Sequence, residues 1–122
     1  ARAILGPDAL LAPEQAVVFS TNADEARAIA RGHMSTYMGL PNYTNNLRRL
    51  GWGDEDLVTP NGPSDKLVDA IVAWGTLDDI HARIKAHLDG GADHVCVQVL
   101  TDAPGALPMK QWQELADATR SI

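Results

Sequence analysis

Two short apolar runs with strand character lie far apart in this chain, and helical patterns fill the interval between them. The first run covers residues 16–20, and the second covers residues 94–100. In the second run Val95, Val97 and Val99 alternate with polar or small residues, as in a strand with two different faces. Strands that are joined by helical crossovers run parallel, with right-handed connections. The sequence therefore predicts an α/β fold with a parallel sheet.

Helical periodicity and capping residues predict the other elements. Asn22 followed by Glu25 is a capping box, and Ser64 and Thr76 are further N-cap residues. Between the first and second helices, several proline and glycine residues break any long element. We expect four helices and one long excursion: helices 23–38, 65–74, 77–89 and 109–120, and the excursion 40–63.

The number of predicted strands is small for a parallel sheet. Parallel strands are normally covered on both faces, whereas these helices suffice for one flank. Near the start of the chain, Gly6 and Pro7 resemble the end of a helix. We therefore expect residues 1–122 to be one part of a larger α/β structure.

Composition excludes several classes of protein. The 122 residues carry a formal net charge of −6, which disfavours binding to nucleic acid. No apolar run approaches the roughly 20 residues of a membrane-spanning helix. The single cysteine, Cys96, excludes an internal disulfide. These features favour a soluble, acidic, cytoplasmic protein.

Two stretches resemble a known family. The segment 74–80, Trp-Gly-Thr-Leu-Asp-Asp-Ile, and the segment 90–95, Gly-Gly-Ala-Asp-His-Val, are similar to the closing part of luciferase-like monooxygenases. The segment 40–51, Leu-Pro-Asn-Tyr-Thr-Asn-Asn-Leu-Arg-Arg-Leu-Gly, is similar to an actinobacterial branch of that family, which is predicted to use the deazaflavin coenzyme F420.

The resemblance implies a fold and an activity. The chain would be the C-terminal part of a (β/α)8 TIM barrel, with residues 16–20 and 94–100 as its last two strands, seven and eight. The intact protein would be an oxidoreductase or monooxygenase that transfers hydride between a small organic substrate and coenzyme F420, with FMN as the alternative. The chain by itself is expected to be inactive, and the resemblance identifies no catalytic residue.

Barrel geometry selects candidate residues on the strands. Active sites of this fold lie at the carboxyl ends of the strands, which singles out Ser20 and Gln98. If the alternating valines face the helices, Cys96 and Gln98 face the interior. The Gln98 amide can both donate to and accept from the edge of a coenzyme ring. The alternative is that neighbouring backbone groups satisfy the Gln98 amide.

The excursion supplies the remaining candidate residues for coenzyme binding. Arg48 and Arg49 can hold a phosphate or an acidic tail, Asn45 can add hydrogen bonds, and Tyr43 can stack on a ring. The alternative is that the two arginines form surface ion pairs with the acidic residues that follow them: Asp54, Glu55 and Asp56.

Other reactive residue types give weaker signals. His81 and His87 are six residues apart on one predicted helix and do not form a metal-binding pair. His33 is interpreted as a helix-packing residue and Cys96 as a small hydrophobic residue. A rival interpretation is a small helical interaction module without enzymatic activity, which forms a homo-oligomer through its open strand edges.

Overall fold

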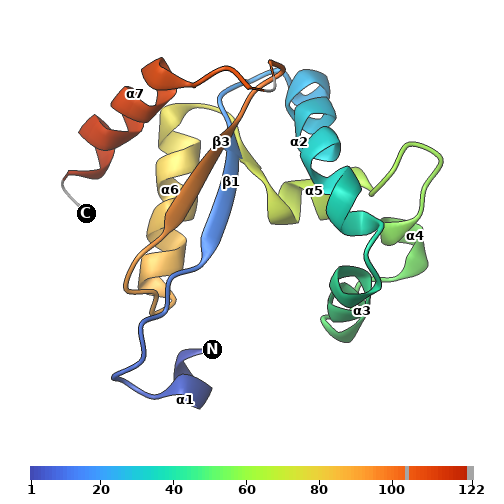
Figure 1. Cartoon of the computed structure of the whole chain (residues 1–122), viewed down its shortest axis with the longest axis horizontal. Helices are drawn as coiled ribbons and strands as arrows, with labels where there is room; N and C mark the ends of the chain where they lie inside the picture. Colours follow the sequence, from blue (N-terminus) through green and yellow to red (C-terminus); the bar gives the residue numbers. More distant parts are fainter. Residues whose placement is uncertain (104, 121–122) are drawn as a thin grey trace.

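The computed structural model describes residues 1–103 and 105–120, and in this part of the chain the strands form one small parallel sheet (Figure 1). The strands are β1 (Glu14–Val18), β2 (Ala73–Trp74) and β3 (Cys96–Leu100), and their order in the sheet is β2-β1-β3. The parallel α/β class that the sequence predicts is thus present.

Strand β1 occupies the centre of the sheet. It pairs with β3 over its whole length, from Glu14 opposite Cys96 to Val18 opposite Leu100. It pairs with β2 through only two positions, Val17 opposite Ala73 and Val18 opposite Trp74.

Strand β2 corrects the prediction of two strands. The helix expected over residues 65–74 ends at Ile71, and the next residues turn into the sheet. The side-chain amide nitrogen of the buried Gln15 donates to the carbonyl of Ile71 at 3.0 Å. The backbone amide of Gly75 donates to the carbonyl of Val18 at 3.2 Å. These bonds depend on residues distant in sequence, so helical periodicity could not reveal them.

The helices otherwise follow the predicted pattern, and the excursion contains helices of its own. Helices 23–38 and 77–89 have the expected bounds, and the last helix ends one residue before the expected limit of 120. The helices are α1 (Arg2–Leu5), α2 (Ala23–Met38), α3 (Pro41–Arg49), α4 (Asp54–Leu57), α5 (Asp65–Ile71), α6 (Leu77–Asp89) and α7 (Met109–Thr119). None of the described helices is long and apolar enough to cross a membrane.

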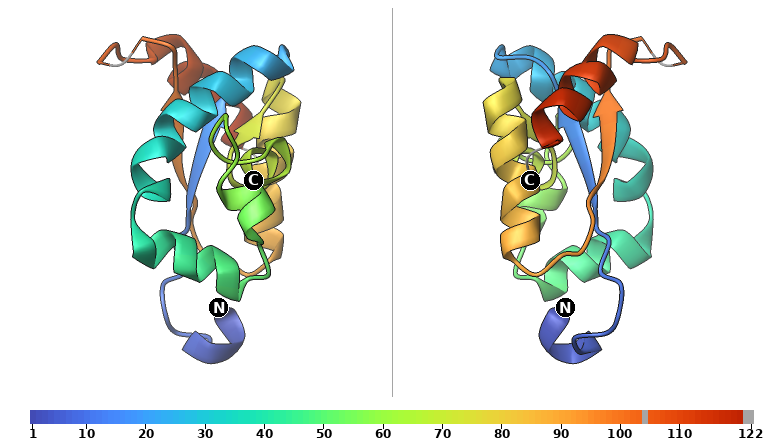
Figure 2. Two further views of the ribbon diagram at one scale, coloured as in Figure 1. Left: turned by 90° about the vertical axis from the view of Figure 1, so that its right-hand side faces the viewer. Right: turned by 90° about the vertical axis from the view of Figure 1, so that its left-hand side faces the viewer.

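The two faces of the sheet bury different residues of β1. Ala16 and Val18 pack with residues of α2 and α5, and Leu100 of β3 packs against the same cluster. Val17 faces the opposite way, into a second cluster formed with residues of α6 and α7. Figure 2 shows helices on both sides of the strands. The expectation of helical cover on a single flank is therefore wrong.

The strand order explains why the helices divide between two faces. The connection from β1 to β2 runs through α2 to α5, whereas the connection from β2 to β3 runs back past β1 through α6. Right-handed crossovers that proceed in opposite directions place their helices on opposite faces. The described chain is thus an open, doubly wound sheet, whereas a barrel has all its helices on the outside.

Polar contacts fix the connections on the α2 side. Arg27 of α2 donates to both carboxylate oxygens of Asp69, at 3.0 and 2.6 Å, and the Trp74 indole donates to Asp69 at 2.8 Å. The hydrogen bond from Arg27, followed by the bond from Trp74 and the charge of Arg27, lowers the pKa of Asp69. This cluster joins α2, α5 and β2, and all buried polar side-chain atoms of the described residues have partners.

Candidate functional site

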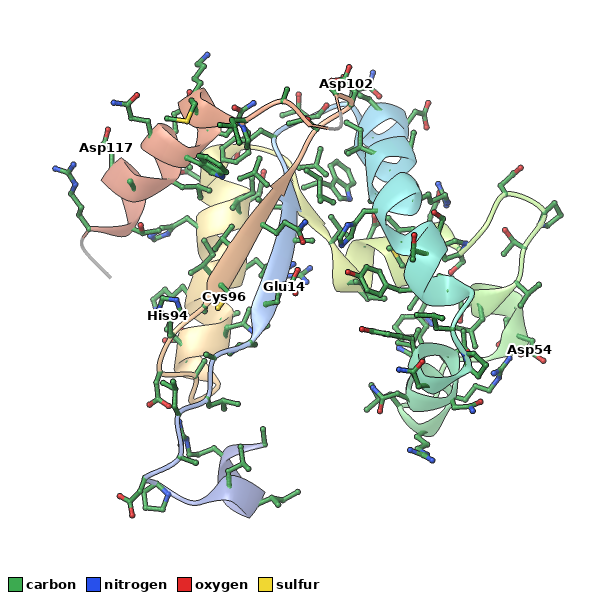
Figure 3. All side chains as sticks on the ribbon, viewed as in Figure 1. Glu14, Asp54, His94, Cys96, Asp102 and Asp117 are labelled. Carbon is green, nitrogen blue, oxygen red and sulfur yellow. The ribbon has the colours of Figure 1, made fainter. Side chains whose placement is uncertain are left out.

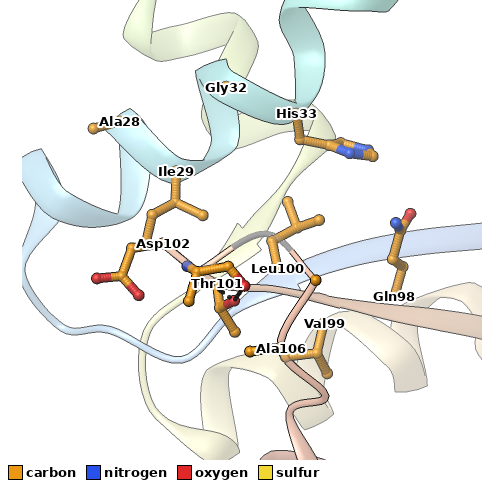
Figure 4. Close-up of a pocket in the computed structure, with 12 residues that line it drawn as sticks. Ala28, Ile29, Gly32, His33, Gln98, Val99, Leu100, Thr101, Asp102 and Ala106 are labelled. Atoms are coloured by element: carbon orange, nitrogen blue, oxygen red, sulfur yellow. Dashed lines mark hydrogen bonds between the residues drawn. The ribbon is translucent and has the colours of Figure 1, made fainter.

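A cleft of about 660 Å³ lies between α2 and the carboxyl-terminal half of β3 (Figure 4). Parallel α/β proteins bind ligands at the carboxyl ends of their strands, near the point where the chain changes direction across the sheet. After β1 the chain enters α2 on one face, and after β3 it leads to α7 on the other, so the cleft lies beside this point. Its lining includes Ile29, Gly32, His33, Gln98, Leu100 and Thr101.

The joint between β1 and α2 orients the helical wall of the cleft. The Asn22 side chain accepts hydrogen bonds from the amides of Asp24 and Glu25, at 3.1 and 3.2 Å, and so caps α2. Ile29, Gly32 and His33 have the i, i+3, i+4 spacing of one helix face. The cap therefore fixes the start of a helix that turns these residues toward β3.

Gly32 leaves room in the cleft. A β-carbon at this position would meet no other atom within 4 Å, so close packing does not require a glycine here. A glycine inside a helix costs about 0.5–1 kcal/mol relative to alanine. The open position lets a ligand approach the backbone of α2 closely.

Gln98 provides the polar group on the strand side. It lies opposite Ala16 in the ladder, on the face that α2 covers, and its side chain is exposed. Within the described residues the side-chain amide of Gln98 forms no hydrogen bond. The alternative, in which neighbouring backbone groups satisfy this side chain, does not hold there. The amide can therefore offer a donor and an acceptor to a ligand.

His33 extends the cleft toward the excursion. It lines this cleft and also a smaller cavity of about 260 Å³ that Tyr37, Tyr43 and Asn46 border. Its ring lies edge-on to Tyr37, with centroids 5.4 Å apart, and Tyr37 lies 4.9 Å from Tyr43. Gln98 thus borders the first cavity and Tyr43 the second, and His33 borders both. The sequence interpretation of His33 as a helix-packing residue agrees with its contact with Tyr37. The position of His33 on the lining of both cavities was not predicted.

The other predicted coenzyme ligands lie elsewhere. Arg48 donates to Asp54 at 2.9 Å and to Asn45 at 3.4 Å, which is the surface pairing considered as the alternative. Arg49 is exposed on α3, and neither arginine lines the cleft. Among the described residues, no lysine or arginine borders the cleft to hold an acidic tail.

Ser20 also lies outside the cleft. It borders a separate cavity of about 500 Å³ that includes Thr76 and Lys110. Its hydroxyl donates to Glu25 at 2.6 Å and accepts from the amide of Asn22 at 3.2 Å. Because Ser20 helps to form the β1–α2 joint, it contributes to the cleft only through the position of α2.

Reactive groups add little to the chemistry of the cleft. Cys96 is a free, exposed thiol on the same strand as Gln98, and Asp102 at the end of β3 also borders the cleft (Figures 3 and 4). No group of three metal-binding side chains occurs among residues 1–103 and 105–120. The cleft therefore has apolar walls and a few polar groups, an arrangement typical of small-molecule sites.

The fold and cleft define an open, parallel α/β domain with a candidate small-molecule site. Comparison with protein-family models, with curated proteins and with solved structures finds no match for this chain. A functional proposal therefore rests on the cleft and on the resemblance of segments 40–51, 74–80 and 90–95.

Proposed function

We propose that this chain contributes one wall of the coenzyme site of an oxidoreductase. The reaction is a hydride transfer between a small organic substrate and a deazaflavin, coenzyme F420, with FMN as the alternative. The chain alone is inactive, because it supplies binding groups and no identified catalytic residue. The proposal places the protein in the cytoplasm, where an exposed thiol such as Cys96 remains reduced.

The observation that carries the proposal is the cleft between α2 and β3. Its volume of about 660 Å³ lies within the usual range of small-molecule sites, roughly 300–1,000 Å³. Ile29 and Leu100 offer apolar surface to the flat ring of a coenzyme, and Gln98 offers hydrogen bonds to its edge. His33 supplies a second polar group on the opposite wall.

The residues that line the cleft suit the ring of the coenzyme but not its anionic tail. Neither Arg48 nor Arg49 borders the cleft, and Arg48 is paired with Asp54. In the proposed complex the tail therefore extends beyond the cleft. Either it remains in solvent, or other parts of a larger protein bind it.

The (β/α)8 barrel belongs to this proposal as the architecture of a larger protein. The pairing of β1 with β3 over five positions is what neighbouring barrel strands require. The edge position of β2 and the placement of α2 opposite α6 weigh against a barrel for the chain alone. A structure of a longer protein with strands added beside β3 and all helices outside would support this part of the proposal.

A binding titration tests the proposal. Deazaflavin or FMN is titrated with the chain, and the change in ligand fluorescence gives Kd. Gln98→Leu keeps the size of the side chain and removes its hydrogen bonds, so it should raise Kd about tenfold, the effect of roughly 1.4 kcal/mol. Gln113→Leu, at an exposed position of α7 outside the cleft, is the matched control and should leave Kd unchanged.

Two results would count against the proposal. The first is that neither coenzyme changes its fluorescence on addition of the chain. The second is that Gln98→Leu and Gln113→Leu affect Kd equally. A larger residue at Gly32 gives a further test, because Gly32→Leu should obstruct the cleft while occupying space that is open in the structure.

A second candidate function is an interaction module that forms a homo-oligomer without enzymatic activity. The specific observation is the exposure of β3. The residues Gln15 to Val18 of β1 are buried, whereas β3 has no buried residue. Parallel sheets normally have both faces covered, and the unpaired edge of a strand is a template for pairing. Strand β3 is therefore suited to pair with another strand.

A further inference from the structure

The outer edge of β3 carries hydrogen-bonding groups that the sheet does not use. The amide of Cys96 donates to the carbonyl of Pro13 at 2.9 Å, and β3 is the last strand of the order β2-β1-β3. In a parallel ladder alternate residues direct both backbone groups to the same neighbour. The backbone N–H and C=O groups of alternate residues therefore point to β1 from Cys96, Gln98 and Leu100. Those of Val95, Val97 and Val99 point outward, away from the sheet.

This edge lacks the features that prevent strands from pairing. Charged residues, proline and bulges are the usual protection of an edge strand. The stretch Val95 to Leu100 has no charged residue, proline or glycine. Among the described residues no element continues the sheet beyond β3.

We propose that a second copy of this chain pairs its β3 antiparallel with this edge, about a two-fold axis that passes beside Val97. This pairing rests on the second candidate function and specifies the partner. Val97 faces Val97 of the second copy, and Val95 faces its Val99, so that all the outward backbone groups form hydrogen bonds. The two three-stranded sheets become one continuous sheet, and the two-fold symmetry closes the assembly as a dimer.

The distribution of charge favours this register. Only Asp93 and Asp102 carry negative charge next to the strand. With the axis at Val97, Asp93 faces Thr101 of the second copy, and Asp102 faces its Ala92. A shift by one residue in either direction turns the outward backbone groups out of register, and in one direction it also places Asp93 opposite Asp102, which is unfavourable for like charges.

The side chains also fit a continued sheet. The valines at 95, 97 and 99 are only half-buried, and they pack on the α6 and α7 side. In the proposed dimer they lie next to the same valines of the second copy, as cross-strand β-branched pairs that stabilise sheets. Cys96 lies opposite Gln98 of the second copy on the other face.

Sedimentation equilibrium tests the pairing. The chain should sediment at twice its 13.1 kDa mass, with a dimer that dissociates on dilution. Val97→Lys places two ammonium groups opposite each other at the axis, and should raise the dimer Kd at least tenfold. Val58→Lys, at a position that is 72% exposed and far from β3 in sequence, is the control and should leave the Kd unchanged.

A disulfide tests the register at two exposed positions, where folding is not at risk. Opposite residues of a non-hydrogen-bonded antiparallel pair have Cα atoms about 4.5 Å apart, which suits a disulfide. Gln98→Cys should therefore give a covalent dimer on mild oxidation, through bonds between the new thiol and Cys96 of the second copy. Adding Cys96→Ser should reduce this cross-linking at least tenfold.

A monomer at all concentrations, or cross-linking that does not depend on Cys96, would overturn the pairing. These results are independent of coenzyme binding. A monomeric chain that still changes deazaflavin or FMN fluorescence would remove the dimer and leave the oxidoreductase proposal. A dimer that binds neither coenzyme would do the reverse.

Discussion

Two adjacent valines of β1 provide a direct test of the three-layer arrangement. Val17 is fully buried and faces α6 and α7, and Val18 is 2% exposed and faces α2 and α5. Val17→Ala and Val18→Ala remove the same two methyl groups from the same strand. They differ only in the face of the sheet from which the methyl groups are lost.

The expected loss of stability is similar for both variants. Each methyl group contributes about 0.8 kcal/mol by burial, and the cavity left behind adds to the cost. We expect each variant to lose about 2–3 kcal/mol in the free energy of unfolding. With a urea m-value of about 2 kcal/mol per molar, the midpoint of unfolding should fall by about 1–1.5 M.

Urea unfolding followed by tryptophan fluorescence measures these changes, with Val58→Ala as the control. Val58 is 72% exposed, so its substitution should change stability by less than about 0.5 kcal/mol. If Val18→Ala is as mild as the control while Val17→Ala is costly, α2 does not cover the second face. That outcome would refute the doubly wound arrangement and would remove the helical wall of the cleft.

Three further substitutions test other parts of the fold. Arg27 lowers the pKa of Asp69, so the Asp69 carboxylate stabilises the fold above the ordinary carboxyl pKa, and this contribution is lost as pH falls through the lowered pKa. Below about pH 4, the stability of Asp69→Asn should therefore fall less steeply than that of the unchanged chain. Urea unfolding at each pH measures this difference. Gly75→Ala should lower the unfolding free energy by about 1–3 kcal/mol in the same urea assay, because Gly75 has φ +133° and a β-carbon there would lie 2.5 Å from an Asp79 carboxylate oxygen. Asp93→Asn weakens the contacts of the loop before β3 with the N-terminal segment, so limited proteolysis followed by mass spectrometry should show faster cleavage before β1.

Local sequence signals identified much of the secondary structure. The capping residues Asn22 and Thr76 accept the hydrogen bonds expected of them, and the helices that they begin have the predicted bounds. The alternation in β3 correctly separated the valines at 95, 97 and 99 from the face that carries Gln98. These features depend on neighbours within a few residues, so that the sequence alone contains the necessary information.

Only part of the candidate site could be found in this way. Gln98 was identified from its place near the carboxyl end of a strand, and Tyr43 from its aromatic ring. The contribution of His33 was missed, because it depends on the packing of α2 over β3. Arg48 was expected to face a ligand, but it pairs with Asp54, six residues further along the chain.

The sequence by itself determined helices α2 and α6, the approximate positions of β1 and β3, and which residues of β3 alternate between its faces. The tertiary structure decided that Ala73 and Trp74 form a strand, that β1 is central, and that helices cover both faces. The physical reason is the range of the interactions. Helix caps and side-chain periodicity act within one or two turns, whereas a strand of two residues exists only through its bonds to β1. The order of the strands likewise depends on which face each helix can bury.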